Sequence, residues 1–442
     1  MDRPIHRVLD LIDPDCQQIL SSTVEAARER LLSRDPGALL GLEGSFALWA
    51  RDGENVVLAR SLDRPLRYFL AKQQDGPLLV LSDRIDRIRE ALEREGLGAQ
   101  FHPSYTRMVP AHHVTTLRLI GCPDPSPTHR RFFDPPRGIH PPDLDRIGER
   151  YVAALLREVS VWLDALPEDE PIGVAFSGGA DSGAVLLATV RALLDSGRSA
   201  ARLKAFTLAV EGGGSDLAQA RDFLRASGLE YLHEVIDVPG EAIDPWTAIE
   251  VIEDYKPLDV DCAAVALALF AGIRERYPPW RHLADGDGGD ENFKDYPLEA
   301  GGELTIRSVV SNRMLYQEGW GVDAVKHSQT YSGGLSRGCV RTWAPARRAG
   351  FAAFSPHTRP RVVAEAEAIP WGDLTGGEVE RLYALKGEIL RRGVARALGL
   401  EMPVFPKNRF QDGALPAGLG AGRLGFPEAR YRRHFAGLHG GA

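Results

Sequence analysis

The middle of the chain alternates short apolar runs with longer segments in which apolar residues recur every three or four positions. The short runs are PIGVAF, LKAFTLAV, YLHEVIDV and RHLAD, at 171–176, 203–210, 231–238 and 281–285. Their length and their content of Val, Ile, Leu and Ala are typical of strands buried on both faces. The segment 146–166 before the first run has helical spacing, as do the segments between the runs. This alternation predicts an α/β fold, with a parallel sheet flanked by helices.

Residues 40–120 show a different pattern, in which strand-like runs are separated by turns. Segment 44–61 contains two such runs around a polar turn at 51–55, which predicts a β-hairpin. A further strand is expected within 76–84, and a helix over 84–96 that ends at a glycine. These residues predict a smaller, β-rich domain that precedes the α/β domain.

A proline-rich stretch separates the two patterns. Residues 122–146 contain seven prolines, and prolines at this density favour an extended connection. We therefore expect a β-rich domain over 1–125, a linker over 126–146 and the α/β domain over 147–442.

The first buried strand of the α/β domain ends in an unusual turn. Ser177, Gly178 and Gly179 follow the strand directly, and Asp181 and Ser182 precede an apolar helix. Glycines allow a close backbone approach, and the free N–H groups at the start of a helix attract an anion such as phosphate. A carboxylate suits this place if Mg²⁺ lies between it and the phosphate. The alternative is an ordinary Gly-Ser turn in which Asp181 only caps the helix.

A second glycine-broken loop, LADGDGGDENFKDY at 283–296, follows the strand at 281–285. Ligands of open α/β sheets bind beyond the carboxyl ends of the strands, so Asp290 is expected opposite Asp181. Two carboxylates that face a triphosphate suit one or two Mg²⁺ ions. The alternative is a solvated acidic surface loop.

These two loops carry a resemblance to a known family. SGGADS, at 177–182, is similar to the pyrophosphatase loop of the ATP-pyrophosphatase superfamily, which includes ligases that split ATP into AMP and pyrophosphate. The acidic loop resembles the G-x-G-x-D-E-x-F-x-x-Y segment of the asparagine synthetase and β-lactam synthetase family. The matching residues are Gly286, Gly288, Asp290, Glu291, Phe293 and Tyr296.

Two C-terminal segments extend the resemblance. LYALKGEILRRGV places Lys386 and Arg391 at matching positions, and FPKNRFQDG places Lys407 on the lysine of the family's K-x-x-F-x-x-G segment. The resemblance implies that Lys407 is catalytic and stabilises charge on the adenylate and the tetrahedral intermediate. It also implies sites for ATP and Mg²⁺. The implied ATP-binding residues are Ser177, Gly178, Gly179, Asp181, Ser182, Gly286 and Lys386, and the implied metal ligands are Asp181 and Asp290.

The N-terminal region departs from the family. Residues 38–120 are weakly similar to the later half of the family's glutaminase domain, whose first part has no counterpart here. Those glutaminases use an N-terminal cysteine as nucleophile, but residue 2 is Asp2 and the nearest cysteine is Cys16. We therefore expect a degenerate, truncated domain without glutaminase activity.

The substrate region departs as well. Segment 350–360, GFAAFSPHTRP, retains Gly350 and Pro356 but lacks both charged positions of the corresponding family segment. Asp287 stands where asparagine synthetases carry glutamate, so we include it as a catalytic candidate whose role as a base stays open. The formation of asparagine from aspartate is not expected.

Composition narrows the expected partners and location. The formal net charge of -8 disfavours nucleic acid. No apolar segment reaches the ~20 residues of a membrane span, and the first residues lack the apolar core of a secretory signal. Four scattered cysteines without a CxxC pair argue against a zinc site or a disulfide framework. These features favour a cytoplasmic protein.

The sequence thus predicts an AMP-forming ligase that uses ATP and Mg²⁺ to join a carboxylate substrate to an amine nucleophile. We expect a role in specialised or peptide natural-product biosynthesis, such as lactam or macrolactam closure. Ammonia-dependent amidation, nucleotide or tRNA modification, and a non-catalytic ATP-binding scaffold are alternatives. A peptide or protein partner and a homo-oligomer both stay open.

Overall fold

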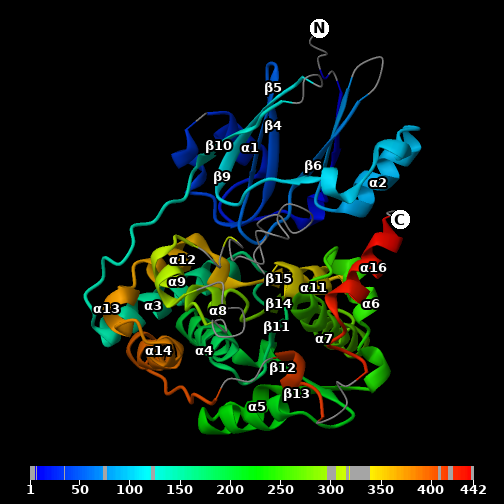
Figure 1. Cartoon of the computed structure of the whole chain (residues 1–442). Helices are drawn as coiled ribbons and strands as arrows, with labels where there is room; N and C mark the ends of the chain where they lie inside the picture. Colours follow the sequence, from blue (N-terminus) through cyan, green and yellow to red (C-terminus); the bar gives the residue numbers. More distant parts are fainter. Residues whose placement is uncertain are drawn as a thin grey trace. The chain divides into compact units, whose positions relative to one another are not determined.

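The computed structural model describes residues 5, 7–33, 35–72, 77–120, 125–295, 305–314, 318, 339–406, 410–416 and 422–439. These residues divide into two units (Figure 1). Unit 1 consists of the described residues of Met1–Asp134, Glu318–Cys339 and Arg433–Ala442, and unit 2 consists of those of Pro135–Gln317 and Val340–Arg432.

Unit 1 contains two four-stranded sheets, with the strand orders β1-β7-β6-β8 and β10-β9-β5-β4, and a short β2-β3 pair. Its strands are β1 Arg7–Leu11, β2 Gln18–Ile19, β3 Gly44–Ser45, β4 Ala47–Asp52, β5 Asn55–Arg60, β6 Arg67–Ala71, β7 Leu78–Ser82, β8 Arg107–Met108, β9 His113–Arg118 and β10 Thr128–Arg131. Its helices are α1 Val24–Leu32 and α2 Ile85–Arg94.

Strand β7 shows how alternation along a strand builds this unit. Leu79 and Leu81 lie in one apolar cluster with residues of β5 and β9, which belong to the other sheet. Leu78 and Val80 lie in a second cluster with Ile88 and other residues of α2. Because successive side chains of a strand point to opposite faces, β7 packs against the second sheet on one face and against α2 on the other.

The predicted hairpin and helix of this unit are confirmed, since β4 pairs antiparallel with β5 and α2 covers most of 84–96. The expected linker differs from the observed boundary. Strand β10 lies inside 126–146 and pairs antiparallel with β9. Along the chain, the boundary between the two units falls between Asp134 and Pro135. The N–H groups of Thr128–Arg131 can join the ladder because the prolines lie on either side of these four residues.

Unit 2 is built on a parallel sheet of five strands in the order β13-β12-β11-β14-β15. The strands are β11 Ile172–Ala175, β12 Leu203–Val210, β13 His233–Val238, β14 His282–Ala284 and β15 Ala352–Phe354. The predicted α/β fold and its four expected strands are confirmed. Strand β15 was not expected from the sequence.

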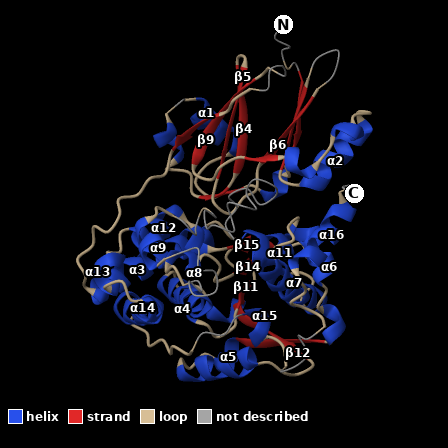
Figure 2. Ribbon diagram, in the orientation of Figure 1, coloured by secondary structure: helices blue, strands red, loops and turns tan. Residues whose placement is uncertain are grey.

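Helices flank this sheet on both faces (Figure 2). They are α3 Leu144–Asp164, α4 Ala180–Asp195, α5 Ser215–Ala226, α6 Pro245–Ile252, α7 Pro257–Arg276, α8 Gly289–Asn292, α9 Ile306–Ser311, α11 Ala344–Arg348, α12 Pro360–Glu367, α13 Trp371–Thr375, α14 Val379–Gly393, α15 Phe410–Gly413 and α16 Glu428–Leu438, which continues into unit 1. Figure 1 shows α4 and α7 on opposite sides of β11, as expected when the chain reverses direction along a sheet through right-handed crossovers.

The strand order places a topological switch at β11. From β11 the chain builds β12 and β13 on one side and then returns to build β14 and β15 on the other. At such a switch the loops after two adjacent strands diverge and leave a crevice at the carboxyl edge. The loops after β11 and β14 are the two glycine-rich loops singled out in the sequence. They are in contact, because an ideal Cβ on Gly286 would lie 2.7 Å from the backbone nitrogen of Ser182.

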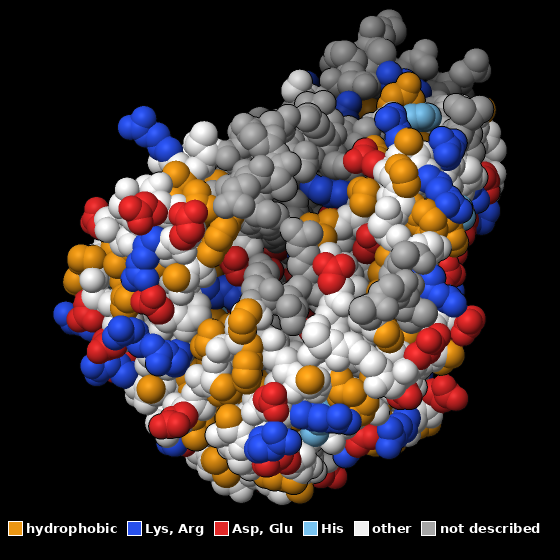
Figure 3. Space-filling model, turned by 60° about the horizontal axis from the view of Figure 1, so that its bottom comes forward, with side chains coloured by type: hydrophobic (Ala, Val, Ile, Leu, Met, Phe, Trp, Pro, Cys, Tyr) orange, Lys and Arg blue, Asp and Glu red, His pale blue; other side chains and the backbone are white. Residues whose placement is uncertain are grey.

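On the face drawn in Figure 3, Lys and Arg side chains are interspersed with Asp and Glu, so this face does not concentrate the positive charge that attracts a nucleic-acid backbone. None of the helices among the described residues combines the length and the apolar composition that a membrane crossing requires.

A glycine contact sets the distance between α3 and α14. An ideal Cβ on Gly148 would lie 2.5 Å from the carbonyl oxygen of Ile389 and 2.7 Å from the nitrogen of Gly393. Any side chain at Gly148 would therefore push the two helices apart.

We expect Gly148→Ala to destabilise unit 2 by about 1–3 kcal/mol, the usual cost of an overpacked core. The midpoint of thermal or denaturant unfolding measures this effect. Gly372→Ala is the matched control, because Gly372 is exposed and nothing lies within 4 Å of its ideal Cβ. Equal midpoints for Gly148→Ala and the parent would contradict the glycine contact.

Candidate active site

The turn after β11 leads directly into the N-terminus of α4. Gly178 has φ +77°, and an ideal Cβ there would lie 2.6 Å from the backbone nitrogen of Ala220. The Ser177 hydroxyl accepts the N–H of Gly179 at 3.3 Å. Gly179 is the N-cap residue of α4 and no side chain caps the helix, so the capping role considered for Asp181 is not observed. The hydroxyl oxygens of Ser177 and Ser182 lie 3.4 Å apart at the start of α4, an arrangement that suits phosphate oxygens.

Lys386 of α14 brings the acidic residues of two loops together. Its Nζ lies 2.6 Å from Asp181 Oδ2, 2.5 Å from Asp290 Oδ1 and 3.0 Å from Asp295 Oδ2. The expected approach of Asp290 to Asp181 is therefore present, and Asp295 is an addition. Burial by itself would lower the pKa of Lys386, but the three carboxylates raise it well above its usual value. The ammonium stays charged and holds the carboxylates in place.

This cluster fits a divalent cation. Three carboxylates converge on Lys386, and carboxylate oxygens are the ligands that Mg²⁺ prefers. Gly289 leaves room for Asp181, because an ideal Cβ on Gly289 would lie 2.3 Å from Asp181 Oδ1. Asp181 and Asp290 are the side chains that could hold the ion next to a phosphate bound at the turn.

A network of buried hydrogen bonds lies next to the cluster. The Asn292 amide donates to the Tyr151 hydroxyl and to the His357 carbonyl, each at 2.9 Å. The Tyr151 oxygen lies 2.8 Å from His357 Nδ1, and His357 Nε2 lies 3.3 Å from the Asp181 carbonyl oxygen. Burial lowers the pKa of His357 to about 4, so the ring is neutral near pH 7. Since a carbonyl only accepts, Nε2 carries the proton and Nδ1 accepts the tyrosine hydroxyl.

Asp287 lies three residues before Asp290 in the acidic loop. Its Oδ2 accepts a hydrogen bond from the Thr342 hydroxyl, and its backbone N–H donates to Asp285 Oδ1 at 3.0 Å. Burial, and then the charge of Asp285, raise the pKa of Asp287 well above its ordinary value. A raised pKa makes the ionised form of this carboxyl group a stronger proton acceptor than an ordinary aspartate.

The remaining candidates from the sequence differ in their exposure and contacts. Arg391 is exposed on α14, whereas Lys386 on the same helix is buried. Phe293 is a packing residue, with its ring centroid 4.7 Å from that of Tyr151. Lys407 and Tyr296 lie outside the described residues, so the structure adds nothing on either.

The motifs missed several residues that the structure brings to the site. Tyr151, Asn292, Asp295, Thr342 and His357 are joined to it by hydrogen bonds or ion pairs. Asn292 and Asp295 stand inside the acidic loop, where their spacing next to Asp290 was the available signal. Tyr151, Thr342 and His357 come from other parts of the chain and had no such signal.

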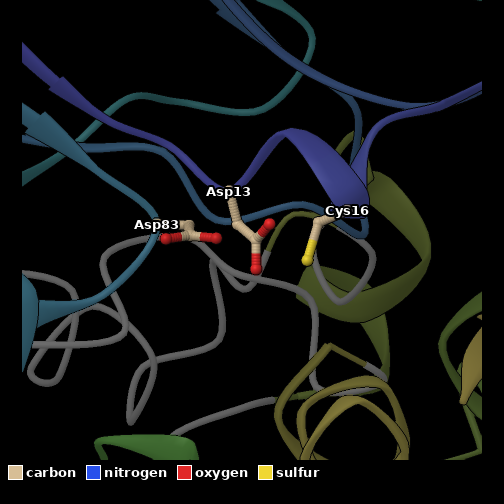
Figure 4. Close-up of side chains that lie close together, drawn as sticks. All are labelled: Asp13, Cys16 and Asp83. Carbon is tan, nitrogen blue, oxygen red and sulfur yellow. The ribbon is translucent and has the colours of Figure 1, made fainter. Parts of the chain in front are cut away.

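Within the described residues of unit 1, three side chains form a group of possible metal ligands. One ligand atom each from Asp13, Cys16 and Asp83 lies within 4.8 Å of the others (Figure 4). However, Arg87 lies 3.5 Å from Asp13 and 3.4 Å from Asp83, and Arg64 lies 3.8 Å from Asp83. The two guanidinium groups already neutralise the carboxylates, so this group is an ion-pair network. Cys16 is 4% exposed.

Comparison with known proteins bears on the same part of the chain. The protein-family model for asparagine synthase matches residues 163–347, a range that contains the turn after β11 and the acidic loop after β14. Tyr151, His357 and Lys386 lie outside this range and complete the cluster from α3, from the loop after β15 and from α14. A search of curated proteins found no match to this chain.

This family uses ATP and Mg²⁺ to join a carboxylate to an amine, and the matched strands and loops are those that form the switch point and the acidic cluster. Residues 163–347 of this chain therefore form an asparagine synthase domain, which implies ATP-dependent amidation.

Proposed function

We propose that this protein is an AMP-forming amide ligase without glutaminase activity, and that it closes or joins amides in specialised or peptide natural-product biosynthesis. The observation that carries the proposal is the convergence of Asp181 and Asp290 on Lys386 beside the N-terminus of α4. A phosphate cradle next to paired carboxylates is what the cleavage of ATP at the α-phosphate requires.

In the first half-reaction, an oxygen of the substrate carboxylate attacks the α-phosphorus of ATP. The bond from that phosphorus to the bridging oxygen breaks, and pyrophosphate leaves with the bond's electron pair. Ser177, Ser182 and the first N–H groups of α4 bind the polyphosphate. Mg²⁺, when bound, neutralises charge on the phosphates. Asp181 and Asp290 would hold the ion, and Lys386 keeps both carboxylates aligned.

In the second half-reaction, the amine nitrogen attacks the carbonyl carbon of the acyl-adenylate. The carbon–oxygen bond to AMP breaks and the nitrogen loses a proton. Asp287 accepts this proton, and the hydrogen bond from Thr342 orients its carboxylate. Lys407 stabilises the negative charge that develops on the adenylate and on the tetrahedral intermediate.

We propose three alternative sources for the amine: the carboxylate substrate itself, a second substrate or free ammonia. Thioester formation with glutamine requires an accessible nucleophilic cysteine, and Cys16 of unit 1 is buried. Unit 1 then supports the synthetase domain or binds a peptide or protein partner.

Isotope exchange between labelled pyrophosphate and ATP tests the proposal. The exchange reports adenylation whatever the amine is, so a panel of peptides and small acids can be screened with one readout. Exchange that depends on both a carboxylate and Mg²⁺ supports the ligase. ATP binding without exchange across a broad panel supports the scaffold alternative.

We expect Asp181→Asn and Asp290→Asn to reduce exchange by at least about 10²-fold, since charge neutralisation by a metal ion is worth several kcal/mol. Asp195→Asn is the matched control, because this residue ends the same helix as Asp181 and is exposed in a surface ion pair. Circular dichroism checks the fold of each variant. Exchange near the parental rate in both site variants would contradict the proposed role of the two carboxylates in adenylation.

Lys386→Met should make the fold more dependent on Mg²⁺. The variant keeps a long side chain but leaves three carboxylates without their ammonium, so Mg²⁺ should stabilise it more than the parent. Ligand at a hundredfold excess over Kd contributes about 2.7 kcal/mol. The unfolding midpoint is measured while Mg²⁺ is titrated without nucleotide. Equal shifts in variant and parent would contradict a cation site at these carboxylates.

Lys407→Ala should separate ATP binding from chemistry. The turn after β11 and the metal ion hold the polyphosphate, so we expect ATP affinity within about tenfold of the parent, or ~1.4 kcal/mol. AMP formation should fall by ~10²–10³, the cost of one preorganised oxyanion donor. Calorimetric titration of ATP and single-turnover AMP release give the two values. Equal losses in both would assign Lys407 to ground-state binding.

A further inference from the structure

A buried carboxyl group lies at the start of α5, outside the site described above. Asp216 is the second residue of this twelve-residue helix and is 3% exposed. Its Oδ2 is buried, and no hydrogen-bond partner for it is found among the described residues. A buried carboxylate without a partner is costly, so the neutral form of Asp216 is favoured.

The segment 410–416 packs directly on this group. An ideal Cβ on Gly413 would lie 1.9 Å from Asp216 Oδ1, so only a glycine fits over the carboxyl group. Gly214, two residues before Asp216, has φ +113°, and an ideal Cβ there would lie 2.7 Å from the carbonyl oxygens of Gly413 and Ala414. The two backbones are therefore in contact, and Asp216 is enclosed between them.

The charges around this contact oppose the ionisation of Asp216. Burial first, and the charge of Asp412 second, raise the pKa of Asp216 to about 7. Asp412 lies on α15 and is exposed. It is the charged group that acts on Asp216 among the described residues of both packed elements. Ionisation would place an uncompensated buried carboxylate next to a like charge.

The same segment is anchored on a second side. The Cys262 thiol of α7 donates to Gln411 Oε1 at 3.3 Å, and both side chains are buried. The segment is thus attached to both α5 and α7. Segment 410–416 begins three residues after Lys407 in the chain.

We propose that the neutral carboxyl group of Asp216 is a positioning group that holds segment 410–416 against α5, and that ionisation of Asp216 releases this contact. The contact itself does not depend on the proposed function. Its consequence for the rate does, because that consequence acts through Lys407.

The sign of the pH effect follows from linkage. When the segment opens, Asp216 enters water and its pKa returns from about 7 to its ordinary value of 3.8. Between these values the closed form holds a proton that the open form has lost, so the opening constant rises tenfold per pH unit. Above about pH 7 both forms are ionised and the constant becomes level.

Amide hydrogen exchange of the full chain, read by mass spectrometry on peptides that cover 410–416, tests this inference. After correction for intrinsic exchange, protection of the parent should fall by up to tenfold per unit between pH 5 and 7 and become level above pH 8. Asp216→Asn keeps the shape without the charge, so its protection should not change with pH. Asp412→Asn should move the level region to lower pH.

Asp222→Asn is the matched control, since this residue lies exposed on the same helix in a surface ion pair, and it should behave as the parent does. A pH-independent parent would overturn the proposal without reference to any variant, and so would the same pH dependence in Asp216→Asn. Neither measurement needs a substrate, so a failure of pyrophosphate exchange leaves this inference intact. With an active substrate, Asp216→Asn should extend AMP formation to higher pH at unchanged ATP affinity.

Discussion

The ammonium group of Lys386 is the interaction on which the candidate site depends. It holds Asp181, Asp290 and Asp295, which reach it from α4 and from the acidic loop after β14. Lys386 itself comes from α14, whose distance from α3 is set by the backbone contact at Gly148. The positions of the two glycine-rich loops are thus coupled to a helix contact that is made by backbone atoms. A small change in the packing of α3 against α14 would move Lys386 and, through its side chain, shift the three carboxylates.

The parts of the fold that could be predicted from sequence are those fixed by local pattern. Four strands of the parallel sheet carry continuous apolar runs, and the turn at Ser177 combines its glycines and hydroxyls within six residues. The chain Tyr151–His357–Asn292 could not be predicted, because its members are 141 and 206 positions from Tyr151. Only the packing of α3 against the sheet brings them together. The position of β10 was missed because the prolines flank four residues that are themselves free to pair.

The surroundings of the buried titratable groups determine which protonation state each of them favours. Burial is the largest influence on Lys386, His357 and Asp287 alike. Carboxylates overcome burial at Lys386 and keep it charged, whereas His357 has a cation nearby and stays neutral. At Asp287 the adjacent carboxylate acts in the same direction as burial and favours the protonated form. A cation, a neutral hydrogen-bond relay and a carboxyl group of raised pKa therefore occur close together because each has a different neighbour.

The charges and protonation states at the candidate site bear on the choice between a ligase and a scaffold that only binds nucleotide. A buried ion cluster is weak as a device for stability, because well-packed apolar residues in its place are often as stable or more so. Phosphate binding alone would be served by the N-terminus of α4. Carboxylates close to that position would repel the phosphate. The three carboxylates around Lys386 become favourable when a divalent cation accompanies the phosphate, and Asp287 becomes useful when a proton must be removed. The charges at this switch point are thus arranged for a reaction rather than for binding alone, which favours the ligase.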